Sequence, residues 1–492
     1  MSDPLNKLLS LFPHQSIRPT QAAALRVIAQ MFREDRGFTI IEAPTGAGKS
    51  ALAFTTALYA ASCDDQQFRS GAYILTPSNN LAEQMIGAFG DIGIAALKGR
   101  RHYTHQKSSS YENAKSAFYT NSIGVTNYAY FLKASHLPER QVLVLDEAHN
   151  LERILLDHAG FAITPQICRA ARIGTPPPLD KTQTQIVDWL GLVLLPALEE
   201  EMNRCNKIDE QRRECMDLAE RVANYLQTDD RDHWLLWAEE RVLNAKPLSV
   251  ATQAHDLFAR ARHVLIQSAT VFDFASFESM LGIPDTALRF SAESDFPVGN
   301  RPIFYKPIGD MASRAAEKTV PDLCREVERI VKGFGASKGI VHTHSYWINN
   351  QVSEHLKGQL GDRVITHGHD PRQREKAIRC HCTFPGASVL VSPSLTEGID
   401  LAGDLARFQV ICKVPFPRLD AYARARVKRD RRWYDLKTAW ALVQTAGRAI
   451  RSDTDFATTF ILDSRFGDFA SRNSSILPAW WKTSIRSSTE GL

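Results

Sequence analysis

The feature that most constrains the fold is a glycine-rich turn between an expected strand and an expected helix. Residues 42–50 read Glu-Ala-Pro-Thr-Gly-Ala-Gly-Lys-Ser, after the apolar run 38–41 and before the small, apolar run 51–60. In such a turn, backbone N–H groups close around phosphate oxygens, a lysine reaches the outer phosphates and a hydroxyl ligates Mg²⁺. The order strand, turn, helix is the one that this chemistry requires. We therefore expect a nucleotide to contact Thr45, Gly46, Gly48, Lys49 and Ser50.

A second apolar run ends in two adjacent carboxylates. Residues 142–149 read Val-Leu-Val-Leu-Asp-Glu-Ala-His, so a buried strand is expected to deliver Asp146 and Glu147. Beside a phosphate-binding turn, the first carboxylate holds the metal and the second activates a water. The two patterns together predict nucleotide hydrolysis, with Ser50 and Asp146 as Mg²⁺ ligands and Glu147 as the catalytic carboxylate.

The chain is long enough for more than one core, because 492 residues exceed the usual domain size. Short apolar strands alternate with helical stretches in both halves, which is typical of parallel sheets covered by helices. We predict an α/β fold with two tandem mononucleotide-type domains, residues 1–300 and 301–492. The expected strands include residues 38–41, 73–76, 142–145, 263–270, 339–343, 387–391, 408–412 and 458–462.

The segment from residue 151 to residue 262 has a different character. Charged, helix-spaced patterns over 182–224 and 234–243 predict a mostly helical insertion, whereas 157–178 reads as irregular. The residues after Trp481 are expected to form a loose tail.

Composition excludes several classes of protein. The net charge of +4 is too mild to indicate a polyanion binder, so such contacts must come from local clusters. The first residues lack a secretory pattern and the longest apolar runs, such as 189–195, are too short for a bilayer, so we expect a cytoplasmic protein without membrane contact. The eight cysteines lack paired C-x-x-C spacing, and Cys380-His-Cys382 has too few neighbouring ligands for a metal site.

A basic motif in the second half can complete the nucleotide site. In Gln444-Thr-Ala-Gly-Arg448-Ala-Ile-Arg451, the arginines are three residues apart and would share one face of a helix. Guanidinium groups delivered across a cleft neutralise charge on the transferred phosphoryl group. A solvated basic helix face is the alternative, but the nucleotide site elsewhere in the chain favours a catalytic role for Gln444, Arg448 and Arg451.

These motifs, taken in order, resemble those of superfamily 2 helicases of the XPD/DinG type. Further matching segments are residues 17–21, 75–84, 124–128, 268–270, 339–346, 394–400 and 413–417. The resemblance implies two RecA-like motor domains, an arch-like insertion at 151–262, ATP and Mg²⁺ as cofactors, and 5′ to 3′ movement on single-stranded DNA coupled to duplex unwinding. It also implies nucleotide contacts by Arg18, Gln21, Glu397, Gly398 and Asp400, and nucleic-acid contacts by Thr76, Asn127, Tyr128 and Ser345.

The sequence departs from this family at one place. Members typically carry four cysteines that hold an iron–sulfur cluster, but the corresponding insertion, residues 98–123, contains no cysteine. We therefore expect no iron–sulfur cluster. The retained Gly-Arg-x-x-Tyr start suggests that the segment still lies beside nucleic acid, through Arg100, Arg101 and Tyr103.

Residues 418–434 form the densest basic and aromatic cluster of the chain. Single-strand binding needs cations along a groove and rings for base stacking, so Arg424, Arg429 and Trp433 are candidate contacts. The alternative is a solvated basic helix closed by a core tryptophan. We expect the lone aromatics Trp347 and Trp440 to lie in the core.

The missing cysteines leave other functions open. The chain is expected to act as a monomer on single-stranded or tailed duplex DNA. It can instead be a DNA-dependent ATPase that translocates or remodels without unwinding. It can also be recruited by a partner, such as a phage, plasmid or CRISPR effector complex.

Overall fold

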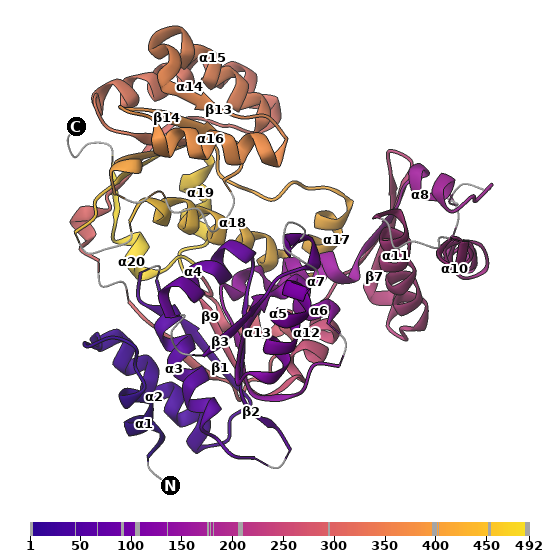
Figure 1. Ribbon diagram of the computed structural model, residues 1–492. Coiled ribbons are helices and arrows are strands. Elements are labelled where there is room, and N and C mark those ends of the chain that lie inside the picture. Colours follow the sequence, from indigo (N-terminus) through magenta and orange to yellow (C-terminus); the bar gives the residue numbers. More distant parts are fainter. Residues whose placement is uncertain are drawn as a thin grey trace.

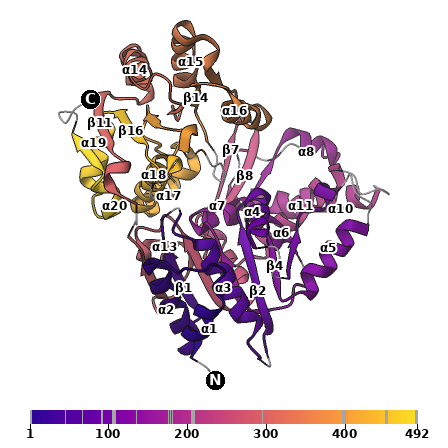
Figure 2. The same ribbon diagram turned by 60° about the vertical axis from the view of Figure 1, so that its left-hand side comes forward.

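The computed structural model contains two parallel sheets, each covered by helices on both faces, and a third, small antiparallel sheet (Figures 1 and 2). It describes residues 3–44, 46–65, 67–89, 93–103, 109–134, 136–174, 177, 179–180, 182–204, 210–293, 296–395, 401, 403–450 and 454–487. The predicted α/β class with two parallel sheets is confirmed. None of the helices within these ranges is long and apolar enough to cross a membrane.

The first sheet has seven parallel strands. This sheet and the helices that cover it are called the first lobe. In spatial order they are β10 (Leu288–Ser291), β1 (Phe38–Glu42), β9 (Ala261–Ser268), β5 (Arg140–Leu145), β2 (Arg69–Thr76), β4 (Ile123–Asn127) and β3 (Ile94–Leu97). Its central strands are buried on both faces, which explains their continuous apolar runs. Helices α1 (Pro4–Ser10), α2 (Pro19–Arg33), α3 (Lys49–Ala61) and α4 (Asn79–Phe89) pack on one face. Helices α5 (Ser109–Thr120), α6 (Tyr128–Lys133), α7 (Leu151–Ala159), α12 (Ala251–Phe258) and α13 (Phe274–Leu281) cover the other.

The second sheet, the core of the second lobe, is also parallel. Its order is β13 (Val364–Thr366), β14 (Val389–Ser392), β12 (Gly339–His342), β15 (Phe408–Ile411), β16 (Thr458–Asp463), β11 (Ile303–Gly309) and β17 (Ile485–Ser487). Helices α14 (Ser313–Gly333) and α15 (Tyr346–Leu360) pack on one face. Helices α16 (Pro371–Thr383), α18 (Arg431–Ala446), α19 (Arg465–Arg472) and α20 (Ala479–Lys482) pack on the other, and α17 (Ala421–Arg429) precedes α18.

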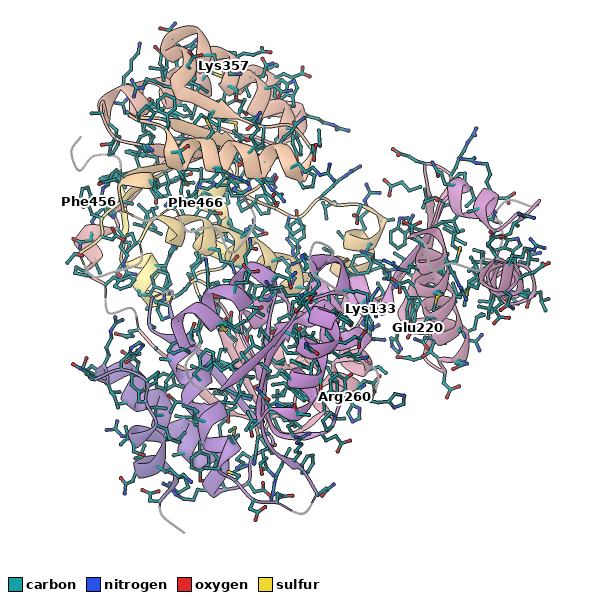
Figure 3. All side chains as sticks on the ribbon, viewed as in Figure 1. Lys133, Glu220, Arg260, Lys357, Phe456 and Phe466 are labelled. Atoms are coloured by element: carbon teal, nitrogen blue, oxygen red, sulfur yellow. The ribbon has the colours of Figure 1, made fainter. Side chains whose placement is uncertain are left out.

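The insertion between β5 and β9 projects to one side of the two lobes (Figure 1). Helices α8 (Pro165–Ala170), α9 (Gln183–Trp189), α10 (Leu195–Arg204) and α11 (Glu210–Gln227) pack on the antiparallel sheet of β6 (Phe161–Ile163), β8 (Val242–Pro247) and β7 (Trp234–Glu239). Figure 3 shows Lys133 and Arg260 of the first lobe beside Glu220 of α11, and these residues line a hollow between the lobe and the insertion.

Three expectations about secondary structure are wrong. Residues 234–243 form the β7–β8 hairpin instead of a helix, because Glu240 and Arg241 both adopt positive φ, as a tight hairpin turn requires. The stretch 157–178 contains β6 and α8 and is not irregular throughout. Residues 485–487 are not a loose tail, since β17 pairs with β11 at the sheet edge.

Candidate ATP site

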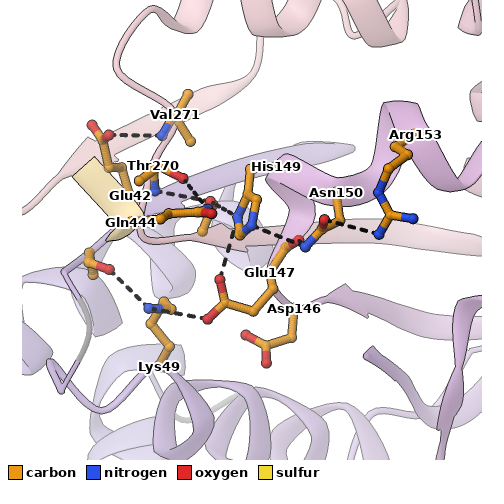
Figure 4. Close-up of polar contacts among 12 residues, drawn as sticks. Glu42, Lys49, Asp146, Glu147, His149, Asn150, Arg153, Thr270, Val271 and Gln444 are labelled. Carbon is orange, nitrogen blue, oxygen red and sulfur yellow. Dashed lines mark hydrogen bonds and ion pairs between the residues drawn. The ribbon is translucent and has the colours of Figure 1, made fainter. Parts of the chain in front are cut away.

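The candidate site forms where three neighbouring strands of the first sheet end. Strands β1, β9 and β5 are adjacent and parallel, with Glu42 opposite Ser268 and Leu145 opposite Ile266. Because parallel strands end at one edge, residues 43–44, 46–50, 146–149 and 268–270 meet there despite their separation in sequence (Figure 4). This edge of the sheet therefore collects the motifs predicted to bind and hydrolyse ATP.

The glycine-rich turn has the backbone that its sequence predicts. Gly46 and Gly48 have φ values of +82° and +85°, in the left-handed region that favours glycine. A Cβ atom on Gly48 would lie 2.1 Å from Nε2 of Gln21. The turn leads into α3, where the ammonium group of Lys49 donates to the carbonyl of Ala43 at 3.1 Å. Lys49 is thus held by the loop itself and points across the strand ends.

Arg18 and Gln21, which are expected to contact the nucleotide, brace this turn. Gln21 is buried; its Nε2 donates to the carbonyl of Ala47 and its Oε1 accepts from the N–H of Arg18. The guanidinium group of Arg18 donates to the carbonyl of Gly46 at 2.8 Å. In this structure both side chains therefore support the loop, and their predicted contact with the nucleotide stays a prediction.

The two carboxylates after β5 lie in different surroundings. Burial, followed by the charge of Glu147, raises the pKa of Asp146 to about 7. Its Oδ1 is buried and has no hydrogen-bond partner among the residues that the structure describes. A buried oxygen of this kind, with the Ser50 hydroxyl in the first turn of α3, fits the hard oxygen ligands that Mg²⁺ prefers. Glu147 has a left-handed backbone and places Oε1 3.8 Å from Nζ of Lys49.

A chain of polar contacts runs from Glu147 toward the second lobe. His149 Nδ1 lies 3.4 Å from Oε2 of Glu147 and 2.9 Å from the hydroxyl oxygen of Ser268. The hydroxyl of Ser268 accepts from the N–H of Thr270, and Oγ1 of Thr270 accepts from Nε2 of Gln444 at 3.2 Å. The carboxylate that would orient water is thereby connected to the helix that precedes the arginine motif (Figure 4).

Sequence reasoning missed Glu42 at the end of β1. One oxygen of its buried carboxylate accepts from the N–H groups of Val271 and Phe272, and the other accepts from the hydroxyl of Ser291. Glu42 thus fixes the segment that follows Thr270. An acidic residue that ends an otherwise apolar buried strand was the available signal.

Comparisons with known proteins match both lobes. Residues 14–163 match the model of the type III restriction enzyme, res subunit, and residues 329–484 match that of the helicase C-terminal domain. ATP-dependent helicase DinG of Mycobacterium tuberculosis is 30% identical over 267 residues, which cover 49% of this chain and 38% of that protein. An XPD helicase structure has a TM-score of 0.67 at 15% identity and covers 96% of this chain and 100% of its own. The structure of S. tokodaii Xpd4 has a TM-score of 0.60 at 15% identity and covers 94% of this chain and 99% of its own.

Together these matches support an XPD/DinG-type superfamily 2 helicase. This confirms the resemblance seen in the motifs, and the two sheets are its tandem RecA-like motor domains. The structural likeness concerns the fold. The chain spans well under half the length of the DinG protein that it matches.

Several predicted site residues lie outside the described residues. These are Thr45 of the phosphate loop, Glu397, Gly398 and Asp400 of the second lobe, and Arg451. Arg448 lies in the short 3₁₀ turn Gly447–Ala449 directly after α18, and its side chain, like that of Arg101, is outside the description. Their predicted roles stay predictions.

Three residues expected to face nucleic acid are buried instead. The hydroxyl of Thr76 donates to the carbonyl of Ser78, and that of Tyr128 donates to the carbonyl of Asp146. The indole N–H of Trp433 donates to the carboxylate of Glu152. Their side chains belong to the core and to the contact between the lobes, because each of the three is itself buried.

The remaining nucleic-acid candidates are spread over both lobes. Asn127 caps α6, Ser345 caps α15, and Tyr103 accepts a hydrogen bond from the N–H of Lys98. Arg100 pairs with Glu112 at 2.7 Å. On α17, Arg424 and Arg429 are exposed.

The remaining expectations concern the two lone tryptophans and the Cys380-His-Cys382 segment. Trp440 is buried as predicted, but Trp347 is 44% exposed, so its assignment to the core is wrong. Within the described residues no group of three or more histidine, cysteine or acidic side chains could hold a metal ion. His381, between Cys380 and Cys382, instead pairs with the carbonyl of Leu405 and the hydroxyl of Ser388.

Proposed function

We propose that this chain is an ATP-dependent motor that moves along single-stranded DNA, 5′ to 3′, and couples ATP hydrolysis to duplex unwinding. Residues 1–300 would form the first motor domain, with insertions at 98–123 and 151–262, and residues 301–492 the second. The observation that carries the proposal is the meeting of Lys49, Glu147 and Thr270 of the first lobe with Gln444 of the second. A single nucleotide bound at this edge would lie beside residues of both lobes.

The chemistry follows from the side chains at this edge. Lys49 would bind the outer phosphates, while Ser50 and Asp146 would hold Mg²⁺, which neutralises phosphate charge when bound. Glu147 would orient the attacking water. Arg448 and Arg451, which follow α18, would stabilise the negative charge that develops on the phosphoryl oxygens. Because these arginines come from the other lobe, their engagement would require closure of the lobes.

The DNA contact rests on exposed cations. Arg424, Lys428 and Arg429 are exposed on α17, and charges of this kind bind the phosphates of a single strand independently of sequence. By family resemblance the polarity would be 5′ to 3′. We expect a monomer that acts in the cytoplasm.

A second candidate function is supported by the cysteine-free segment 98–123. In related helicases the cluster domain forms part of the pore and wedge, so a chain without it can translocate or remodel without separating strands. Such a DNA-dependent ATPase would depend on a recruiting protein or ribonucleoprotein complex.

The deciding experiment measures ATPase and strand separation together on 5′-tailed, 3′-tailed and RNA-tailed duplexes. The motor proposal expects DNA-stimulated ATPase and unwinding of the 5′-tailed DNA duplex. ATPase without unwinding would favour the second function, and no ATPase would refute both. Lys49→Ala should abolish ATPase and leave DNA binding measurable, whereas Lys357→Ala, a change at an exposed lysine on α15, should behave as wild type.

A further inference from the structure

One face of α18 lies against the first lobe along its length. Trp433, Lys437, Trp440 and Gln444 are spaced by four, three and four residues, so they form a single stripe on the helix. Each reaches a first-lobe partner. Trp433 and Lys437 contact Glu152, the indole N–H of Trp440 donates to the carbonyl of Val271, and Gln444 donates to Thr270.

Glu152 is the anchor of the N-terminal half of this stripe. It lies in the first turn of α7, which follows the Asp146–His149 motif directly, and only 1% of its side chain is exposed. Its Oε1 accepts from Arg426 of α17 at 2.7 Å, and its Oε2 lies 2.9 Å from Nε1 of Trp433 and 2.8 Å from Nζ of Lys437. One carboxylate of the first lobe therefore holds two helices of the second.

Additional contacts fix α17 and α18 at the same place. Arg426 also donates to the carbonyl of Leu248, and the hydroxyl of Tyr422 donates to the carbonyl of Pro247. Arg432 pairs with Asp273. These contacts add to the attachment of α17 and α18, and the second hydrogen bond of Arg426 helps to fix its guanidinium group beside Glu152.

The electrostatics of Glu152 favour an orienting role. Burial alone would raise its pKa, but the charges of Lys437 and Arg426, together with the hydrogen bonds from Lys437 and Trp433, hold that pKa below its usual value. A buried, paired charge adds little net stability compared with apolar packing, yet it is costly to leave unpaired. Such a group therefore penalises any arrangement of the lobes that separates it from its partners.

We propose that Glu152 is a positioning residue for ATP hydrolysis. By holding the first turns of α18, it sets where Gln444 and the segment beginning at Gly447 meet the ATP site. This inference rests on the proposed function. Glu152 touches no phosphate in this scheme and acts only through α18.

Glu152→Gln tests the role, because it keeps the size of the side chain and removes its charge. We expect the DNA-stimulated kcat to fall by about tenfold to a hundredfold, as for a small misplacement of catalytic groups, with little change in the KM for ATP. Amide hydrogen exchange in α18 should rise. Glu326→Gln is the matched control, since Glu326 pairs with Lys306 and Arg329 inside the second lobe, both at 2.8 Å, and this variant should keep the wild-type kcat.

A double variant separates positioning from stability. If Glu152 acts through α18, Glu152→Gln should reduce kcat much less when Gln444 is already alanine. Wild-type kcat in Glu152→Gln, or independent effects of the two substitutions, would overturn the positioning role while the proposed function stands. A wild-type chain without ATPase activity would instead overturn the proposed function, and the positioning role with it.

Discussion

The amide of Gln444 donates a 3.2 Å hydrogen bond to the hydroxyl of Thr270, and this contact joins the two lobes beside the candidate ATP site. Thr270 is in turn tied to Ser268 and His149, which lies beside Glu147. The carboxylate of Glu147 is therefore connected to α18 through a few short contacts.

Removing this contact should uncouple the lobes. In Gln444→Ala we expect a loss of roughly tenfold to a hundredfold in DNA-stimulated ATPase, because the arginine segment loses its register against the first lobe. DNA binding should persist. Parallel ATPase and DNA-binding titrations check this, with Gln351→Ala, at an exposed position on α15, as the control. An unchanged kcat in Gln444→Ala would show that the contact is incidental.

Gly48→Ala should disable nucleotide binding. The added Cβ would clash with Gln21 Nε2 at 2.1 Å, and the left-handed backbone costs about 1–2 kcal/mol for a residue with a side chain. We expect loss of ATP affinity in a fluorescent-nucleotide titration, with the fold retained. Gly87→Ala in α4 is the matched control, since no atom lies within 4 Å of its added Cβ and its φ is not in the left-handed region. Equal ATP affinity in the two variants would contradict the assignment.

Arg140 should be essential to the stability of the first lobe. Its side chain is fully buried and donates to the carbonyls of Ala72, Ser122, Phe118 and Asn121. Arg140→Met would remove all four of these hydrogen bonds from the interior, and we expect a loss of about 3 kcal/mol in the free energy of unfolding by urea denaturation. Arg69→Ala, which removes two carbonyl contacts at an exposed position, should cost less than about 1 kcal/mol. A similar cost for both would refute the argument from burial.

His381 should make the second lobe sensitive to acid. Burial lowers the pKa of His381 from 6.5 to about 4. Between these values the unfolded chain binds a proton that the folded chain does not, so the free energy of unfolding should fall as pH decreases from 6.5 to 4. The slope of urea stability against pH over this window should be shallower in His381→Gln. Identical slopes would exclude the histidine as the source.

Local patterns predicted much of the fold and of the site. The glycine-rich turn, the Asp146-Glu147 pair and the buried strands follow from spacing within a few residues, and the structure brings them to one edge. The β7–β8 hairpin was missed because the spacing of its apolar and charged residues also fits a helix. In addition, Glu240 and Arg241 adopt positive φ although neither is a glycine, so the sequence carries no signal for the turn. Glu152 could not be found because Arg426, its partner, is 274 residues away in sequence.

The ladder between β5 and β9 has a consequence beyond the site. It places Leu145 opposite Ile266, so hydrogen bonds across the sheet, and not the intervening chain, set the distance between the Asp146-Glu147 pair and Ser268. The part of the insertion between Gly160 and Ala245 can thus be lengthened, shortened or replaced without changing the arrangement of the residues at the edge of the sheet. Related proteins can therefore differ in the part that contacts the substrate while the residues at the edge of the sheet keep the same arrangement.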